Sequence, residues 1–304
     1  MINRQEIDGI TWVDLESPST EELREVQDEF DINPFIISEL TAPTLKPSVV
    51  TAENYIYLIL HFPVERHSHT LETAQEIDFI LGKNFIITGR YDVVDPVHKL
   101  HKILETEAII DEEPPFEHTG ELFYRIVMKM YAGVLHELEY QDTRITDIEK
   151  EMFAGREKEM VFEISKVSTV LRNFASIINT HTSVLESFAN SAHECFAKDF
   201  SLYSKALLGE QLRVKTTIEN YLSQTSELRE TNNSLLSTKQ NEIMKTLTVM
   251  AFVAFPLSVV ASIFGMNTVD MPIIGMPHDF WIVVGIMVAM TLAFFMYFLA
   301  KRWL

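Results

Sequence analysis

Residues 263–268 read Ile263-Phe264-Gly265-Met266-Asn267-Thr268, and this short stretch separates two long apolar segments. Neither segment, Thr246–Met266 or Phe280–Ala300, contains Asp, Glu, Lys, Arg or His. Each has about 20 residues, which as a helix rising ~1.5 Å per residue crosses a hydrocarbon core of ~30 Å. The chain is therefore predicted to end in two transmembrane helices that are joined at this stretch.

The charges that flank the two apolar segments predict their orientation. Lys239 and Lys245 precede the first segment, Lys301 and Arg302 follow the second, and residues 267–279 between them contain no Lys or Arg. Because positively charged flanks stay on the cytosolic side, both termini are predicted to be cytosolic and the connecting loop external. We expect a multi-pass protein of the cell (inner) membrane, in contact with the lipid bilayer.

The composition is acidic and narrows the range of functions. The 25 Lys and Arg residues are outnumbered by 44 Asp and Glu residues, for a formal net charge of −19. Such a surface repels nucleic acid and attracts cations, so no nucleic-acid partner is expected. The single cysteine, Cys195, excludes an internal disulfide and fits a reducing compartment. No pattern of a nucleophile, phosphate loop or catalytic triad is present, and neither an enzyme nor an organic cofactor is expected.

The residues before the apolar segments predict an α/β domain followed by long helices. Apolar alternation and turn signals predict strands at residues 11–16, 55–60, 76–81 and 84–88. Helices are predicted at residues 19–30, where Ser19 and Glu22 form a capping box, and at residues 34–41 and 96–107. Long stretches without proline predict helices at residues 122–153, at residues 158–197 and from residue 201 onward. The predicted domains are a cytosolic α/β domain at 1–115, a cytosolic helical hairpin at 116–199, a stalk helix continuous with the first transmembrane helix at 200–266, an external loop at 267–279, and a second transmembrane helix with a basic cytosolic tail at 280–304.

Two periodic patterns mark the long C-terminal helix. The first is a packing seam at spacings of 4, 3 and 7, formed by Val214, Ile218, Tyr221, Leu228 and Leu235. Its polar members are Thr225, Asn232 and Lys239. Burying polar side chains costs less free energy around a water-filled axis than in the dry core of a coiled coil. The second is a mostly polar or small stripe at Asn241, Met244, Thr248, Ala251, Phe255, Ser258, Ser262 and Gly265. This stripe fits the wall of a water-filled axis in an oligomer, or a close contact between membrane helices.

Several motifs in their topological context resemble the CorA family of magnesium channels. They are Asn241-Glu242-Ile243-Met244-Lys245-Thr246-Leu247-Thr248, Phe255-Pro256-Leu257, Phe264-Gly265-Met266-Asn267, Met271-Pro272 and the Lys301-Arg302-Trp303-Leu304 end. The resemblance implies an α+β cytosolic domain, a long helical stalk and two transmembrane helices, assembled as a funnel-shaped homopentamer whose first spans line a pore. It implies transport of Mg²⁺, with Co²⁺ or Ni²⁺ as further ions, and closure of the pore by intracellular Mg²⁺ acting as a regulatory ligand.

The resemblance also implies roles for individual residues. Gly265, Met266 and Asn267 form the selectivity motif, in which Asn267 contacts the hydrated metal through water. The residues that line or gate the pore are Asn241, Met244, Leu247, Thr248, Phe255 and Ser258. Asp270 and Asp279 are the remaining acidic residues of the external loop and attract cations there. No acidic pair is assigned to the regulatory sites.

The sequence departs from the family pattern at two places. Phe255 stands where a methionine is common, and Met271-Pro272-Ile273-Ile274 replaces an acidic loop motif. Two alternatives to a magnesium channel follow from the residues: a zinc carrier of the ZntB type, and a membrane-tethered metal-sensing scaffold that does not transport.

Overall fold

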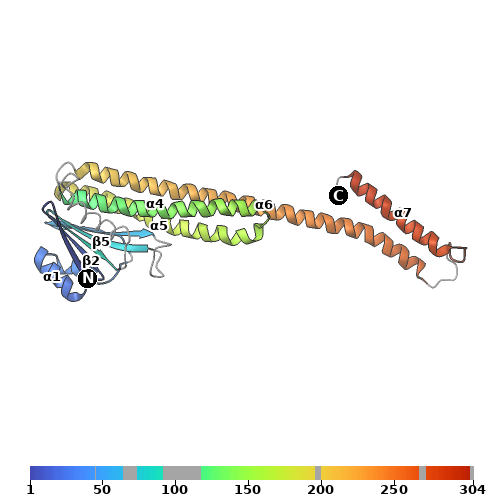
Figure 1. Ribbon diagram of the computed structural model, residues 1–304, viewed down its shortest axis with the longest axis horizontal. Helices are drawn as coiled ribbons and strands as arrows, with labels where there is room; N and C mark the ends of the chain where they lie inside the picture. The colour runs from blue at the N-terminus through green and yellow to red at the C-terminus, as the bar shows by residue number, and fades with distance from the viewer. Residues whose placement is uncertain (45, 64–73, 92–117, 196–199, 267–271, 302–304) are drawn as a thin grey trace. The chain divides into compact units, whose positions relative to one another are not determined.

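The computed structural model describes residues 1–304 except 45, 64–73, 92–117, 196–199, 267–271 and 302–304 (Figure 1). Contacts divide the chain into two units, Met1–Arg229 and Glu230–Leu304. The boundary falls inside helix α6 (Phe200–Phe264), so this one helix contributes to both units. The helix predicted at residues 96–107 and the domain boundaries predicted at 115 and 199 lie outside the described residues.

A mixed sheet of six strands forms the centre of the first unit, in the order β1-β2-β6-β5-β4-β3. Strands β2 and β6 are parallel and the other neighbours are antiparallel. The strands are β1 (Ile2–Ile7), β2 (Ile10–Glu16), β3 (Val49–Thr51), β4 (Tyr55–Pro63), β5 (Ala74–Gly82) and β6 (Phe85–Arg90). The central strands are buried on both faces, which explains why their sequences are nearly continuous apolar runs.

Two short helices cover one face of the sheet. Helix α1 (Thr20–Phe30) begins with the predicted capping box: the Glu22 amide donates to Ser19 Oγ at 3.3 Å, and the Ser19 amide donates to Glu22 Oε2 at 2.7 Å. Helix α2 (Pro34–Glu39) is capped by Asn33, whose Oδ1 accepts from the Phe35 amide at 2.9 Å. Together with the sheet these helices enclose an apolar core.

Two long helices cover the other face of the sheet (Figure 1). They are α4 (Thr119–Phe153) and α5 (Glu157–Cys195). Phe123 of α4 contacts Phe79 of the sheet with ring centroids 5.1 Å apart, and Phe188 of α5 at 4.8 Å. A buried histidine, His181, accepts from the Tyr131 hydroxyl at 2.8 Å and donates to the His61 carbonyl at 2.7 Å. Burial lowers the pKa of His181 to about 4, so it is neutral in this core.

The predicted seam on α6 is confirmed at Val214 and Ile218, and there it packs within the chain. Its members Tyr221, Leu228 and Leu235 are half-buried and Lys239 is exposed. Val214 and Ile218 are fully buried in the first unit. Gln211 Nε2 donates to the Ile178 carbonyl and to Thr182 Oγ1 of α5, both at 3.0 Å. Thr225 is also buried, and its hydroxyl donates to a backbone carbonyl one helical turn earlier. The interpretation of Thr225 as facing a wet axis is therefore wrong: its hydroxyl is satisfied by its own helix.

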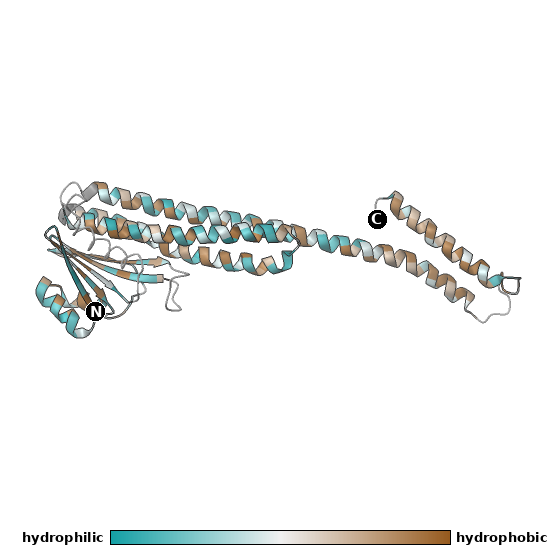
Figure 2. Ribbon diagram, viewed as in Figure 1, coloured by the Kyte–Doolittle hydropathy of each residue, from teal (hydrophilic) through white to brown (hydrophobic). Residues whose placement is uncertain are grey.

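The second unit contains the two predicted apolar helices. Helix α7 (Asp279–Ala300) and the C-terminal part of α6 are long and apolar enough to cross a membrane (Figure 2). Almost none of their apolar surface is buried inside the chain, unlike that of a core helix in a soluble protein. Both predicted spans are thus present as helices, with the motif at Gly265 directly after the end of α6.

Candidate functional site

The polar stripe predicted on the first apolar segment occupies one side of α6. At about 100° per residue, Ala251, Phe255, Ser258, Ser262 and Gly265 fall within an arc of ~80°. All five are exposed in the second unit, and Thr248, the other stripe residue of this segment, is half-buried. The six residues predicted to line or gate a pore fall within a slightly wider arc of ~120°, centred near the same direction; these are Asn241, Met244, Leu247, Thr248, Phe255 and Ser258.

The opposite side of α6 is the side on which the hairpin packs. Val249 is buried, and Val253, Pro256, Val260 and Phe264 are half-buried. The mean direction of these five residues lies ~180° from that of the polar stripe.

Helix α7 contributes its own buried residue to the hairpin. Phe298 of α7 is 5 % exposed. The centroid of its ring lies 6.3 Å from the ring centroid of Phe252 on α6. The apolar contact with α7 therefore leaves the polar stripe uncovered within the chain. The interpretation of the stripe as a contact between membrane helices is therefore excluded for α7 of the same chain. A water-filled axis and a contact with a helix of another copy are the interpretations that are left.

Two hydroxyl groups on this side have a fixed hydrogen-bond polarity. Thr248 Oγ1 donates to the Met244 carbonyl at 2.7 Å, and Ser258 Oγ donates to the Ala254 carbonyl at 2.9 Å. Since each hydroxyl uses its single proton on its own helix, its lone pairs remain as acceptors for other groups. Neutral acceptors suit the water shell of a cation, because the bound waters point their protons outward.

The three residues predicted to narrow a pore are large, apolar and uncovered. Met244 is 55 % exposed, Leu247 is 54 % exposed and Phe255 is 72 % exposed. Side chains of this kind repel water when several copies surround a narrow axis. The structure thus places the predicted apolar constriction and the neutral acceptors on one side of one helix.

The motif begins where α6 ends. The amide of Gly265 donates to the Ala261 carbonyl at 2.9 Å, and the amide of Met266 donates to the Ile263 carbonyl at 3.2 Å. A Cβ atom on Gly265 would lie 3.0 Å from the Ala261 oxygen, which is tighter than most Cβ contacts, so the backbone would have to shift by a few tenths of an ångström. Glycine therefore permits this tight helix end. Asn267 and Asp270, the other predicted site residues of this region, lie outside the described residues.

Asp279, predicted as an external acid, also braces the loop before α7. Its Oδ2 accepts from the Gly275 amide at 3.2 Å and its Oδ1 accepts from the Phe280 amide at 2.7 Å. Gly275 has a φ of +95°, a conformation that glycine adopts without strain. This role was not predicted from the sequence. An Asp at the start of a helix could have indicated it, because such a side chain often accepts hydrogen bonds from nearby backbone amides.

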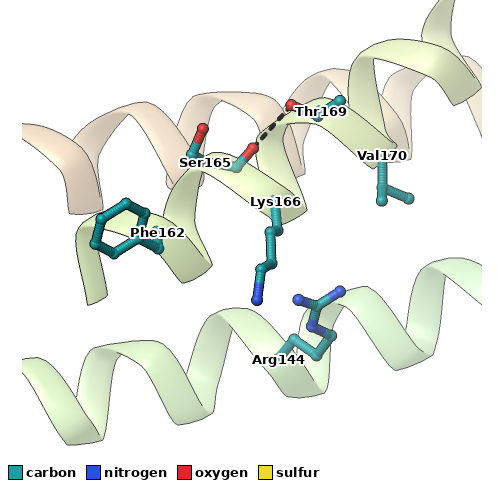
Figure 3. Close-up of a pocket in the computed structure, with 6 residues that line it drawn as sticks. All are labelled: Arg144, Phe162, Ser165, Lys166, Thr169 and Val170. Carbon is teal, nitrogen blue, oxygen red and sulfur yellow. Dashed lines mark hydrogen bonds between the residues drawn. The ribbon is translucent and has the colours of Figure 1, made fainter. Parts of the chain in front are cut away.

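A concave feature apart from the α6 stripe lies between α4 and α5 (Figure 3). It is a groove of about 600 Å³ with Arg144 and Lys166 on facing helices and Phe162 beside them. Glu163 accepts from Lys166 at 2.6 Å and from Arg144 at 3.3 Å, so both cations are already paired. Among the residues that the structure describes, no group of three or more His, Cys, Asp or Glu side chains is placed to hold a metal ion.

Comparisons with known proteins agree on one family. The family model described as CorA-like Mg²⁺ transporter protein matches residues 8–302. The cobalt/magnesium transport protein CorA of Thermotoga maritima is 26% identical over 299 residues, which cover 97% of this chain and 83% of that protein.

Solved structures share the fold. The structure of the CorA magnesium transporter from Methanocaldococcus jannaschii matches with a TM-score of 0.84 at 21% identity, over 97% of this chain and 92% of that chain. The cytoplasmic domain of ZntB from Vibrio parahaemolyticus matches with a TM-score of 0.62 at 13% identity, over 77% of this chain and 89% of that chain. The predicted order of an α+β domain, a long helix and two C-terminal apolar helices is confirmed.

Proposed function

The chain belongs to the family of CorA-like Mg²⁺ transporter proteins, and from that premise we propose that it conducts Mg²⁺ across the cell membrane. The observation that carries this proposal is the polar stripe on α6, which lies opposite the side that packs with α7. A helix that is apolar toward its partner and lipid, and that carries hydroxyls and small residues between a few large apolar ones on its remaining side, fits the wall of an aqueous path. Relatives over nearly the whole chain are named for cobalt and magnesium transport, which supports Mg²⁺ as the ion and Co²⁺ as a further ion. Ni²⁺ is proposed from the family resemblance alone.

The path requires several copies of the chain, because one helix cannot enclose an axis. We propose a homopentamer, the assembly that the resemblance implies, with five copies of the α6 stripe around the axis. In this arrangement Met244 and Leu247 form an apolar girdle that gates by dewetting. Thr248 and Ser258 supply the neutral acceptors, and Asn241 lies at the cytosolic end of the same path. Both termini are cytosolic in this proposal, as the Lys and Arg flanks predict.

Selectivity is assigned to the ring of Gly265, Met266 and Asn267. Mg²⁺ gives up its water shell reluctantly and prefers oxygen ligands. Amide and carbonyl oxygens can hydrogen-bond that shell without replacing it, and they hold the ion weakly enough to release it. Asn267 provides a side-chain carbonyl for this purpose, while Gly265 permits the sharp helix end that precedes it.

Intracellular Mg²⁺ is proposed to close the path. The formal charge of −19 per chain makes neighbouring copies repel one another until cations bridge them. Mg²⁺ would then be both substrate and regulatory ligand. The bridging residues are not assigned.

The test is Mg²⁺ uptake by magnesium-starved cells that express the wild type or Asn267→Ala. We expect the variant to lose most of the uptake, since its ring no longer offers side-chain oxygens to the hydrated ion. Asn173→Ala is the matched control, because Asn173 is exposed on α5 in the first unit. Equal uptake by wild type and Asn267→Ala, at equal membrane expression, would contradict the selectivity assignment.

A zinc carrier of the ZntB type is the second candidate. Its support is a likeness of fold with the ZntB cytoplasmic domain, which carries no information about the ion. Competition in the same uptake assay separates the two candidates: excess Mg²⁺ should suppress the uptake of Zn²⁺ in a magnesium channel, and should leave it unchanged in a zinc carrier. The third hypothesis, a scaffold that does not transport, predicts no uptake above that of cells lacking the protein.

A further inference from the structure

A buried acid lies on the α1/α2 face of the sheet, far along the sequence from the transport motifs. Asp78 of β5 is fully buried. Its Oδ1 accepts from the Tyr57 hydroxyl at 2.8 Å and its Oδ2 accepts from the Tyr91 hydroxyl at 2.9 Å. A carboxylate that is surrounded by neutral phenols and apolar side chains is costly to ionise.

The pKa of Asp78 is raised to about 7. Burial is the main cause and the nearby charge of Glu76 is the second, while the hydrogen bonds from the two tyrosines lower the pKa. The acid therefore changes its charge near neutral pH, where an ordinary aspartate is already ionised. The question is which part of the fold responds to that change.

The segment of residues 39–44, which we call the strap, lies against this acid. Leu40 is 1 % exposed and packs at Gly89, where an added Cβ would lie 2.9 Å from Leu40 Cδ2 and 3.2 Å from Asp78 Cβ. The Tyr91 hydroxyl, which reaches Asp78, also lies 3.3 Å from the carbonyl oxygen of Glu39.

The far end of the strap is held by the neighbouring acid. Glu76 Oε2 accepts from the Thr44 amide at 2.7 Å, and Glu76 Oε1 accepts from the Thr44 hydroxyl at 3.3 Å. His61 Nε2 lies 2.8 Å from the Thr44 carbonyl and 2.9 Å from Glu76 Oε2. The strap is thus fastened at both ends to the polar cluster that contains Asp78.

The two protonation states of Asp78 use the Tyr91 hydroxyl differently. When Asp78 is protonated, it can donate to the Tyr91 oxygen, and the Tyr91 proton is free to reach the Glu39 carbonyl. When Asp78 is ionised, its carboxylate is the stronger acceptor and takes the Tyr91 proton. The Glu39 carbonyl then loses this donor, which loosens the strap at its Glu39 end.

We propose that the strap is a pH-sensitive element, docked when Asp78 carries a proton and loosened when Asp78 ionises. The titratable groups that face Asp78 are Tyr57 and His61 of β4, Glu76 of β5, Tyr91 after β6 and Glu39 of α2. The helix α1 contributes apolar residues to this face.

His61 is the group whose titration must be separated from that of Asp78. Burial lowers the pKa of His61, but the hydrogen bonds with Glu76 and with the Thr44 carbonyl outweigh burial and raise it overall. Asp78→Asn distinguishes the two groups, because the amide keeps the shape of the acid and leaves His61 and Glu76 in place. The introduced amide can accept from Tyr57 and donate to Tyr91, which reproduces the protonated state.

The experiment is hydrogen–deuterium exchange of the full-length protein in detergent at about pH 6 and about pH 8, corrected for the intrinsic exchange rate. In the wild type, the peptide that covers the strap should exchange roughly fivefold faster at the higher pH, the factor expected for losing one hydrogen bond. In Asp78→Asn the strap should stay protected at both values. Asp28→Asn, which changes an exposed acid on α1, should behave as the wild type.

Tyr91→Phe provides an independent test that keeps the ring and removes the hydroxyl. Its strap should exchange fast at both pH values. Equal protection of the wild-type strap at both values would overturn the proposal. So would a pH dependence that persists in Asp78→Asn, which would assign the effect to His61, or one that persists in Tyr91→Phe.

Discussion

Replacing Asp78 by asparagine should stabilise the first unit at alkaline pH, and the size of the effect follows from the buried acid. The folded pKa of Asp78 is raised from the ordinary 3.8 to about 7. A raised folded pKa means that stability is fully present below pH 3.8 and is lost as pH rises through about 7. At ~1.4 kcal/mol per pKa unit, the total loss is roughly 4 kcal/mol, of which roughly 2.5 kcal/mol falls between about pH 5 and pH 8.

Asp78→Asn removes this loss, because the amide does not ionise and can still bond to both tyrosines. The difference in unfolding free energy between variant and wild type should therefore shift by about 2.5 kcal/mol in favour of the variant from about pH 5 to pH 8. Trp12 is a suitable probe, since it is fully buried in the same sheet and its Nε1 donates to Thr88 Oγ1 at 3.0 Å. Urea unfolding would be followed by Trp12 emission in a background in which Trp281 and Trp303 are replaced by phenylalanine.

Taking the difference between the two proteins at each pH cancels the titrating groups that do not interact with Asp78, whereas His61 and Glu76, which interact with it, contribute to the difference through that coupling. A shift near zero would show that Asp78 is ionised in the folded protein throughout this range. That result would refute the reasoning from burial, whatever the stability of the variant at a single pH.

Two further variants test the transport proposal, and a third tests the structural role of Asp279. Phe255→Ala should raise Mg²⁺ flux severalfold, since five exposed rings on the stripe would narrow the path; Phe252→Ala, which removes the ring that contacts Phe298, should not raise it. Gly265→Ala should lower the flux at least tenfold, because the added Cβ crowds the backbone at the helix end; a flux equal to that of Gly209→Ala, where no atom lies within 4 Å, would contradict this. Asp279→Ala should cost about 1 kcal/mol of local stability through the lost bonds to Gly275 and Phe280, seen as faster proteolysis of the loop; unchanged cleavage would remove the bracing role.

Local signals in the sequence were sufficient for much of the fold. The capping box at Ser19 and Glu22 predicted the start of α1, and the two uncharged segments predicted the apolar helices. Strands β1 and β3 were missed because an edge strand needs no apolar pattern: β1 reads Ile-Asn-Arg-Gln-Glu-Ile, and β3 has only three residues. The parallel pairing of β2 with β6 joins residues about 75 apart along the chain, which no local pattern reports.

The seam on α6 shows where periodicity stops being informative. Spacings of 3 and 4 predicted that Val214 and Ile218 are packed, and they are. The spacing could not say where this part of the helix packs. Both residues are buried within the chain, and Gln211 on the same helix bonds to α5, so this part of α6 does not face an oligomer axis. The same limit applied to the polar stripe, and there the burial of Val249 and the half-buried residues beside it decided which side of α6 remains uncovered.

The polar cluster around Asp78 was invisible in the sequence. Glu76 and Asp78 alternate with apolar residues, which is the pattern of a half-exposed strand. Tyr57 and Tyr91 reach Asp78 only because β4, β5 and β6 are neighbours in the sheet. The selectivity residues were, by contrast, assigned from their motif alone, and Asn267 remains a prediction from the sequence.

The central claim is that this chain conducts Mg²⁺ along the α6 stripe, and flux in proteoliposomes tests it most directly. Purified protein would be reconstituted into vesicles that contain a Mg²⁺-sensitive dye, and Mg²⁺ would be added outside. The proposal predicts that the dye signal rises in vesicles with wild type, and that it stays near that of protein-free vesicles with Asn267→Ala. The vesicle interior would be free of Mg²⁺ at the start. The proposal would be contradicted if folded, membrane-inserted wild type gave no more signal than protein-free vesicles.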